Sequence, residues 1–213
     1  PAALWHDVAP DVDVIDVGKE PGKHAVSQSQ INEILVREAS AGRNVVRIKG
    51  GDPFVLGRGG EEALECLAAG ISVEIVPGIT SAIAVPAAAG IPVTHRGLTS
   101  TFIVASAHEG PDGVLAAVSD APHSSTLILL MGAGKLPSIA AALLATGRVP
   151  ETPVAIVESG WTANQRTTIT SLGEAETGTV RVQPPAVVVI GDVVRLRDQL
   201  GDLGKASSDA RHA

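Results

Sequence analysis

The first half of the chain alternates short apolar runs with amphipathic stretches. The runs predict three strands, at 11–17, 44–48 and 72–76. The amphipathic stretches predict three helices: one from the capping-box pattern Ser27-x-x-Gln30 through Leu35, one at 61–69 stopped by Gly70, and one at 79–89. Strands and helices therefore follow one another in this half.

The same alternation begins again after residue 100. The predicted strands lie at 101–106, 126–131, 153–158 and 186–190, and the predicted helices at 113–120, 136–145 and 192–200. Residues 165–171 are rich in β-branched side chains and predict a further strand, antiparallel to its neighbour. A chain of this kind favours an α/β fold.

The pattern divides the chain into two α/β domains. We expect an N-terminal α/β domain at 1–96, a C-terminal α/β domain at 97–202, and a disordered tail at 203–213, which has no periodicity. Ligands of such folds bind in crevices beside the strand ends, so we expect a ligand cleft between the two domains.

Composition narrows the class of protein. Hydrophobic residues make up 45% of the 213 residues, aromatic residues only 2%, and Tyr is absent, which suits a sheet of aliphatic side chains covered by helices. No apolar run approaches the ~20 residues of a membrane span. The net charge of −7 argues against nucleic acid as a partner. A single Cys66 cannot form an internal disulfide, so a cytoplasmic location is expected.

A glycine-rich loop is the strongest chemical signal. In Lys49-Gly-Gly-Asp-Pro53 two glycines directly follow a predicted strand, where they let the backbone turn sharply and approach a ligand. The loop is not a Walker A motif, because its Lys precedes the glycines. A tight turn that packs strand on helix is the alternative interpretation, and it explains Arg58 and the second pair, Gly59-Gly60, less well.

The run from Arg47 to Glu62 is similar to the hallmark of tetrapyrrole methylases, especially those that methylate uroporphyrinogen III. Further matches, in the order of the family, are Val17-Gly-Lys19, Val76-Pro-Gly-Ile-Thr-Ser-Ala82, Gly90-Ile-Pro-Val-Thr-His-Arg96, Met131-Gly132, and segments at 153–160, 164–167 and 185–195. The resemblance covers about residues 11–200.

The resemblance implies C-methylation of uroporphyrinogen III at C2 and C7 to give precorrin-2, for siroheme or cobalamin synthesis. It implies S-adenosyl-L-methionine as methyl donor, S-adenosyl-L-homocysteine as product, and a homodimer. The implied cofactor-binding residues are Gly50, Gly51, Asp52, Val55, Thr80, Ser81, Met131 and Gly160. Lys19 is the implied catalytic residue, acting on the tetrapyrrole, and the implied substrate-binding residues are Lys49, Arg58, His95 and Arg96.

The residues themselves suit this chemistry. Methyl transfer from a sulfonium to a pyrrole carbon needs alignment and proton handling rather than a protein nucleophile. A substrate with eight carboxylates needs cations, and several lie in the motif loops, Lys23 and Arg166 among them. Met131, the only Met, could pack on an adenine face or simply fill a core. His24, His108 and His123 have no metal-site spacing, so no metal is expected.

The chain departs from the family at its start. A first strand and the loop Gly-x-Gly-Pro-Gly-Asp-Pro, whose Asp is the proton acceptor that the resemblance implies, are absent, so the first domain is expected to be truncated. Three other functions stay open: another precorrin methyltransferase, a truncated and inactive ligand-binding remnant, and a nucleotide-binding oxidoreductase. The last lacks a Gly-x-Gly-x-x-Gly motif after any predicted strand.

Overall fold

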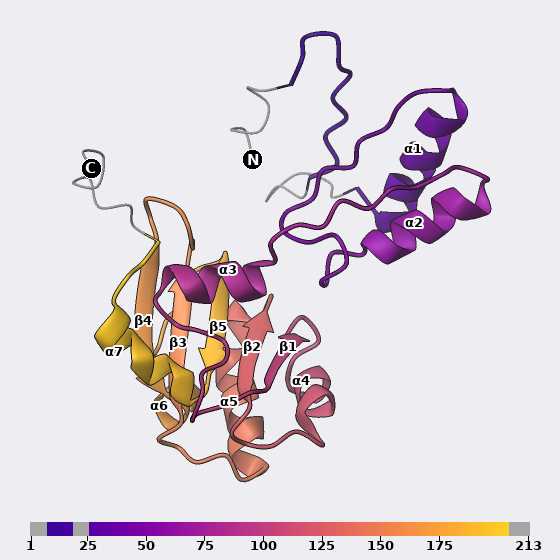
Figure 1. Cartoon of the computed structure of the whole chain (residues 1–213). Coiled ribbons are helices and arrows are strands. Elements are labelled where there is room, and N and C mark those ends of the chain that lie inside the picture. The colour runs from indigo at the N-terminus through magenta and orange to yellow at the C-terminus, as the bar shows by residue number, and fades with distance from the viewer. Residues whose placement is uncertain (1–7, 19–25, 205–213) are drawn as a thin grey trace, which may run out of the picture. The chain divides into compact units, whose positions relative to one another are not determined.

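The computed structural model describes residues 8–18 and 26–204. The chain forms two compact units, Pro1–Pro77 and Gly78–Ala213 (Figure 1). This boundary lies ahead of the 96/97 division that the pattern suggests, because helix α3 (Ser81–Ala88) packs against strands of the second unit. The expected ligand cleft between two domains stays a prediction.

Two helices organise the first unit. Helix α1 (Gln28–Ser40) begins with the predicted capping box, in which Ser27 Oγ accepts from the Gln30 N–H and Gln30 Oε1 accepts from the Ser27 N–H. Helix α2 (Gly59–Ala68) is followed by Gly70 at a φ of 76°, a left-handed conformation that suits glycine. The helices pack through Ile31, Leu35 and Cys66.

The three strands predicted for this unit are wrong. Residues 11–17, 44–48 and 72–76 form no strand in the described part of the unit. Apolar side chains in all three segments face solvent, as the exposed fractions of Val12 (54%), Val46 (83%) and Val76 (74%) show. A strand is stabilised by cross-strand hydrogen bonds and by burial of its faces, and an apolar run supplies neither by itself.

The second unit is built on one mixed sheet. Its strands are β1 (Phe102–Ser106), β2 (Thr126–Leu130), β3 (Pro153–Glu158), β4 (Arg166–Ser171) and β5 (Ala186–Ile190), in the order β1-β2-β5-β3-β4. β1 pairs with β2 in parallel, and the other three pairings are antiparallel. The predicted α/β class is confirmed, as is the extra antiparallel strand at 165–171. The helical elements are α3, α4 (Pro111–Val118), η2 (Ala133–Lys135), α5 (Leu136–Ala145), α6 (Leu172–Glu176), η3 (Asp192–Leu196) and α7 (Arg197–Leu200).

Helical layers cover both faces of this sheet. Alternate strand residues such as Leu127, Ile156 and Val188 belong to a core shared with α4, α5 and α6. Their neighbours, such as Ile128 and Val189, belong to a second core shared with α3 and η3. Every residue of β2 and β3 is buried, as expected for strands covered on both sides.

Strand direction decides where the loops of this unit gather. β2 and β3 both run antiparallel to β5, so they run in the same direction and end at the same edge of the sheet. Neighbouring strands lie about 4.8 Å apart, so the ends of β2 and β3 are separated by about 10 Å, with the beginning of β5 between them. We call this edge the carboxyl edge: Met131 follows β2 there, and Ser159, Gly160 and Trp161 follow β3.

Helix α3 lies across β5 and β2 (Figure 1) and comes very close to Gly160. A Cβ on Gly160 would lie 2.7 Å from Val85 Cγ1 and 2.8 Å from Val85 Cγ2. Gly160→Ala should therefore force α3 away from β3 and lower the free energy of unfolding of this unit by about 1–3 kcal/mol. Denaturant unfolding measures the effect.

Gly134→Ala is the matched control, because an added Cβ there meets nothing within 4 Å. It should leave the free energy of unfolding within about 0.5 kcal/mol of the parent. Equal stabilities of the two variants would contradict the close packing of α3 on the end of β3.

Candidate functional site

The glycine loop of the first unit is a compact turn that leads directly into α2. Asp52 Oδ1 accepts from the Phe54 N–H at 2.8 Å, and the Gly59 N–H donates to the Pro53 carbonyl at 2.9 Å. A Cβ on Gly59 would lie 2.5 Å from that carbonyl oxygen, so only glycine allows this approach. Gly51, with a φ of 77°, makes the preceding turn. The loop expected to bind cofactor, Gly50 to Val55, is thus held against the beginning of α2.

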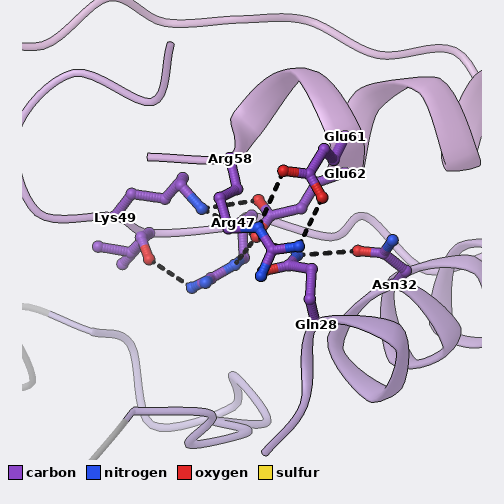
Figure 2. A network of polar contacts seen from close by, with 8 residues as sticks. Gln28, Asn32, Arg47, Lys49, Arg58, Glu61 and Glu62 are labelled. Atoms are coloured by element: carbon purple, nitrogen blue, oxygen red, sulfur yellow. Dashed lines mark hydrogen bonds and ion pairs between the residues drawn. The ribbon is translucent and has the colours of Figure 1, made fainter. Parts of the chain in front are cut away.

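A buried carboxylate fixes the residues just ahead of this loop. Glu62, in the first turn of α2, is only 5% exposed, and both of its oxygens accept from Lys49 Nζ, at 2.8 and 2.9 Å. Gln28 Nε2 of α1 donates to the same carboxylate at 3.1 Å, and Arg47 Nε lies 3.4 Å from it (Figure 2). We call Gln28, Arg47, Lys49 and Glu62 the Glu62 cluster. It joins the residues before the loop to both helices.

The Glu62 carboxylate stays ionised because its partners outweigh its burial. Burial raises the pKa of Glu62, but the hydrogen bonds from Lys49 and Gln28 and the charge of Arg47 lower it, and the pKa ends below its ordinary value of 4.5. Removal of the carboxylate would leave the Lys49 ammonium, whose side chain is 12% exposed, without its ion pair.

Arg58 is paired in a more exposed way. Its guanidinium donates to both oxygens of Glu61, from Nε at 2.9 Å and from Nη2 at 2.6 Å. This hydrogen bond raises the pKa of Arg58 and lowers that of Glu61. Both side chains are about half exposed, so the pair adds little stability.

The cations expected to bind substrate therefore fall into separate groups. Lys49 and Arg58 each pair with a carboxylate of α2, in the first unit. His95 and Arg96 belong to the second unit and are exposed, and the His95 backbone forms an isolated bridge with Thr99. Arg166 Nε donates to the buried Glu158, a hydrogen bond that lowers the pKa of Glu158. Lys19 and Lys23 lie outside the described residues.

Of the expected cofactor residues of the second unit, Met131 and Gly160 lie at the carboxyl edge, and Thr80 and Ser81 lie at the beginning of α3. Met131 directly follows β2 in a left-handed conformation with a φ of 60°, and the residue is 55% exposed, which excludes the alternative of a core Met. Thr80 caps α3, its Oγ1 accepting from the Ala82 N–H at 3.3 Å, and Ser81 is the first, exposed residue of that helix. Gly160 lies against Val85 of the same helix.

Two residues of these sites were not predicted from the sequence. Glu62 was not identified as the partner of Lys49, although a carboxylate in the first turn of a helix after a cationic loop was a usable signal. Trp161 was not predicted as a site residue, although it directly follows Gly160 in a chain with two Trp. Its indole Nε1 donates to the Ala84 carbonyl of α3 at 2.6 Å.

The described residues contain neither a group of metal ligands nor a helix that could span a membrane. Among residues 8–18 and 26–204, no three His, Cys, Asp or Glu side chains are grouped so that they could hold a metal ion. Over the same ranges, none of the helices is long and apolar enough to cross a membrane.

Comparison with known proteins identifies a family. The family model for tetrapyrrole (corrin/porphyrin) methylases matches residues 3–176. The chain is 46% identical over 209 residues to an S-adenosyl-L-methionine-dependent uroporphyrinogen III methyltransferase of Methanosarcina barkeri, covering 94% of the chain and 80% of that protein. It is 43% identical to a siroheme synthase of Edwardsiella ictaluri, covering 89% of the chain but only 41% of the longer protein.

Solved structures agree with these relatives. The chain superposes with a TM-score of 0.70 on the uroporphyrin-III C-methyltransferase of Thermus thermophilus complexed with S-adenosyl homocysteine. The identity is 43%, and the match covers 79% of the chain and 75% of that structure. The resemblance drawn from the motifs is confirmed.

The Glu62 cluster makes the stability of the first unit depend on pH in a predictable direction. Because the folded-state pKa of Glu62 lies below the ordinary 4.5, its contribution is present above pH 4.5 and is lost as the pH falls through the folded-state pKa. Glu62→Gln should lower the local free energy of opening of α2 by about 3 kcal/mol at neutral pH, because it leaves Lys49 without its ion pair. The deficit should shrink on acidification.

Amide hydrogen exchange in α2, measured from pH 7 to pH 3, reports this difference. Glu61→Gln removes an exposed carboxylate from the same turn and should leave the exchange of the α2 amides close to that of the parent at every pH, because an exposed ion pair contributes little stability. A Glu62→Gln profile parallel to that of the parent at all pH values would show that the carboxylate contributes no pH-dependent stability.

Proposed function

The chain belongs to the tetrapyrrole methylase family, and we propose that it methylates uroporphyrinogen III with S-adenosyl-L-methionine as methyl donor. The observation that carries the proposal is the 46% identity, over 94% of the chain, to a uroporphyrinogen III methyltransferase. Two transfers, to C2 and C7, would give precorrin-2. The siroheme synthase relative favours supply of this product to siroheme synthesis.

The residues of the second unit fit the donor by their exposure and backbone geometry. The Met131 thioether is exposed at the carboxyl edge and can pack on an apolar aromatic base. Ser81 and Thr80 present backbone N–H groups and hydroxyls at the beginning of α3, where a negative group is favoured by the helix dipole. Gly160 lets the chain pass close to α3 without a side chain in the way.

In the first unit we propose the glycine loop as the other group of donor-binding residues. Gly50 and Gly51 expose backbone without a Cβ, and a Cβ on Gly50 would meet nothing within 4 Å. Asp52 is set by its hydrogen bond from the Phe54 N–H, and Val55 follows within the same turn. When bound, the donor supplies an electrophilic methyl group on a sulfonium, so these residues need only hold and orient it.

Cationic side chains are needed to bind the carboxylates of the substrate. We propose that His95 and Arg96, both exposed, bind substrate carboxylates directly. Lys49 and Arg58 already have carboxylate partners, so a substrate carboxylate would share or displace Glu62 and Glu61. Lys19 stays the proposed catalytic residue, which donates a proton or pairs with a carboxylate as the pyrrole is methylated.

The cellular location and the oligomeric state follow from the same family resemblance and from the cysteine content. We propose a cytoplasmic homodimer, a location supported by the single Cys66 and an assembly implied by the family resemblance. Cobalamin synthesis, which begins from the same methylated tetrapyrrole, is the alternative route for its precorrin-2. Analytical ultracentrifugation over a range of protein concentrations measures the assembly.

Methyl transfer tests the function directly. The parent chain, incubated anaerobically with uroporphyrinogen III and S-adenosyl-L-methionine, should yield a tetrapyrrole heavier by two methyl groups, detected by mass spectrometry. Asp52→Ala should slow the reaction and weaken S-adenosyl-L-homocysteine binding about 10- to 100-fold, the usual effect of losing a charge-assisted hydrogen bond.

Asp120→Ala, a substitution of an exposed carboxylate in the turn after α4, is the control and should match the parent in both measurements. If the parent binds S-adenosyl-L-homocysteine but leaves uroporphyrinogen III unmethylated, the protein is a ligand-binding protein and the proposed methyltransferase activity is wrong. An unchanged affinity of Asp52→Ala for S-adenosyl-L-homocysteine would show that the glycine loop is not part of the donor site.

A further inference from the structure

Strained backbone in the second unit is concentrated at the carboxyl edge. Among its described residues, three that are not glycine have a positive φ: Met131 at 60°, Ser159 at 48° and Trp161 at 62°. Met131 and Ser159 directly follow β2 and β3, and Trp161 lies two residues after Ser159. A left-handed conformation is costly for bulky side chains such as Met and Trp, and such residues gather where a structure holds a side chain for a ligand.

The Trp161 side chain is held in place, yet its ring is open to solvent. Indole Nε1 donates to the Ala84 carbonyl at 2.6 Å, and the Trp161 backbone N–H donates to Gln165 Oε1 at 2.8 Å. The residue is nevertheless 59% exposed. Since the one polar group of the ring is already bonded, what remains available is an apolar π face.

This ring lies beside the residues proposed to bind the methyl donor. Gly160 precedes Trp161 in the chain, and Ala84 lies three residues after Ser81 on α3, about 4.5 Å along the helix axis. Met131 lies two strands away, across the beginning of β5. The strand ends are separated by about 10 Å, which is comparable to the roughly 7 Å between two groups that stack on opposite faces of one flat ring.

A purely structural role accounts for only part of this geometry. The indole hydrogen bond ties the β3–β4 connection to α3, but Gln165 makes a second tie, donating to the Ala88 carbonyl at 3.4 Å. A structural link between the β3–β4 connection and α3 requires only the indole N–H. It does not explain why the ring is exposed or why the Trp161 backbone is left-handed.

We propose that Trp161 is a donor-binding residue whose indole face stacks on the adenine base, opposite the Met131 thioether. This inference rests on the proposed function, because it takes S-adenosyl-L-methionine as the ligand. Stacking on an aromatic face needs no hydrogen bond from the base, so Trp161 adds affinity while the backbone groups nearby give specificity.

Two substitutions separate the ring from its hydrogen bond. Trp161→Phe keeps an aromatic face but loses the bond to Ala84, whereas Trp161→Leu loses both. Calorimetric titration with S-adenosyl-L-homocysteine should give a dissociation constant about tenfold higher for Trp161→Leu and within about threefold of the parent for Trp161→Phe. Phe102→Leu, at the opposite edge of the same sheet, is the matched control and should bind like the parent.

A spectroscopic measurement tests contact without altering Trp161. The chain has two Trp, so Trp5→Phe leaves Trp161 as the only indole. Saturating S-adenosyl-L-homocysteine should quench and shift its fluorescence, as expected for a ring that becomes stacked and loses water.

The outcomes distinguish this inference from the function on which it rests. Binding by the parent, together with unchanged affinity in Trp161→Leu or equal losses in the Leu and Phe variants, overturns the stacking role alone. Unchanged fluorescence at saturation also overturns it. A parent that does not bind S-adenosyl-L-homocysteine overturns the proposed donor site and the stacking role together.

Discussion

The antiparallel position of β5 between β2 and β3 is the constraint on which the second unit depends. Its Val and Ile side chains point alternately into two cores, so both faces of the sheet must be covered by helices. With β5 running against its neighbours, β2 and β3 share a direction and end at one edge. A slip of one residue would turn each core side chain to the wrong face, so burial fixes both the register and this edge.

The first unit depends on charge where the second depends on apolar burial. Its helices meet through a small apolar cluster around Ile31, Leu35 and Cys66. The residues that lead into the glycine loop are held instead by Lys49 and Arg47 at the buried Glu62. Such a cluster is costly to bury, but its hydrogen bonds are directional and fix the position of the loop. A purely apolar contact would let the loop shift along the helix surface. Lys49 and Arg47 can therefore hold the glycine loop in position instead of neutralising the carboxylates of a substrate.

Much of the second unit could be predicted from its sequence. The helix at 136–145 and the strands at 153–158 and 186–190 have the predicted bounds, because their apolar residues fill a core. The strands at 11–17, 44–48 and 72–76 could not be predicted correctly, because hydrophobicity reports a tendency to be buried and says nothing about an available pairing partner. The family motif identified the glycine loop and Met131, whose side chain is exposed at the carboxyl edge.

What the sequence could not supply was long-range pairing. Lys49 and Glu62 are thirteen positions apart, and their ion pair exists only because the loop folds back onto α2. Trp161 is separated from its acceptor Ala84 by 77 positions, so no local pattern reveals that its indole is held on α3. Periodicity describes faces of single elements, and contacts of this kind are made by the fold.

The central claim is that the carboxyl edge of the second unit holds the methyl donor. Amide-resolved NMR of the chain titrated with S-adenosyl-L-homocysteine tests it most directly, because each backbone N–H reports its own surroundings. The account predicts the largest shift changes in this unit at Ser81, Met131 and Gly160, with little change at the opposite edge, at Thr126 and Ile190. Saturable shifts confined to that opposite edge, with Met131 and Gly160 unmoved, would contradict it.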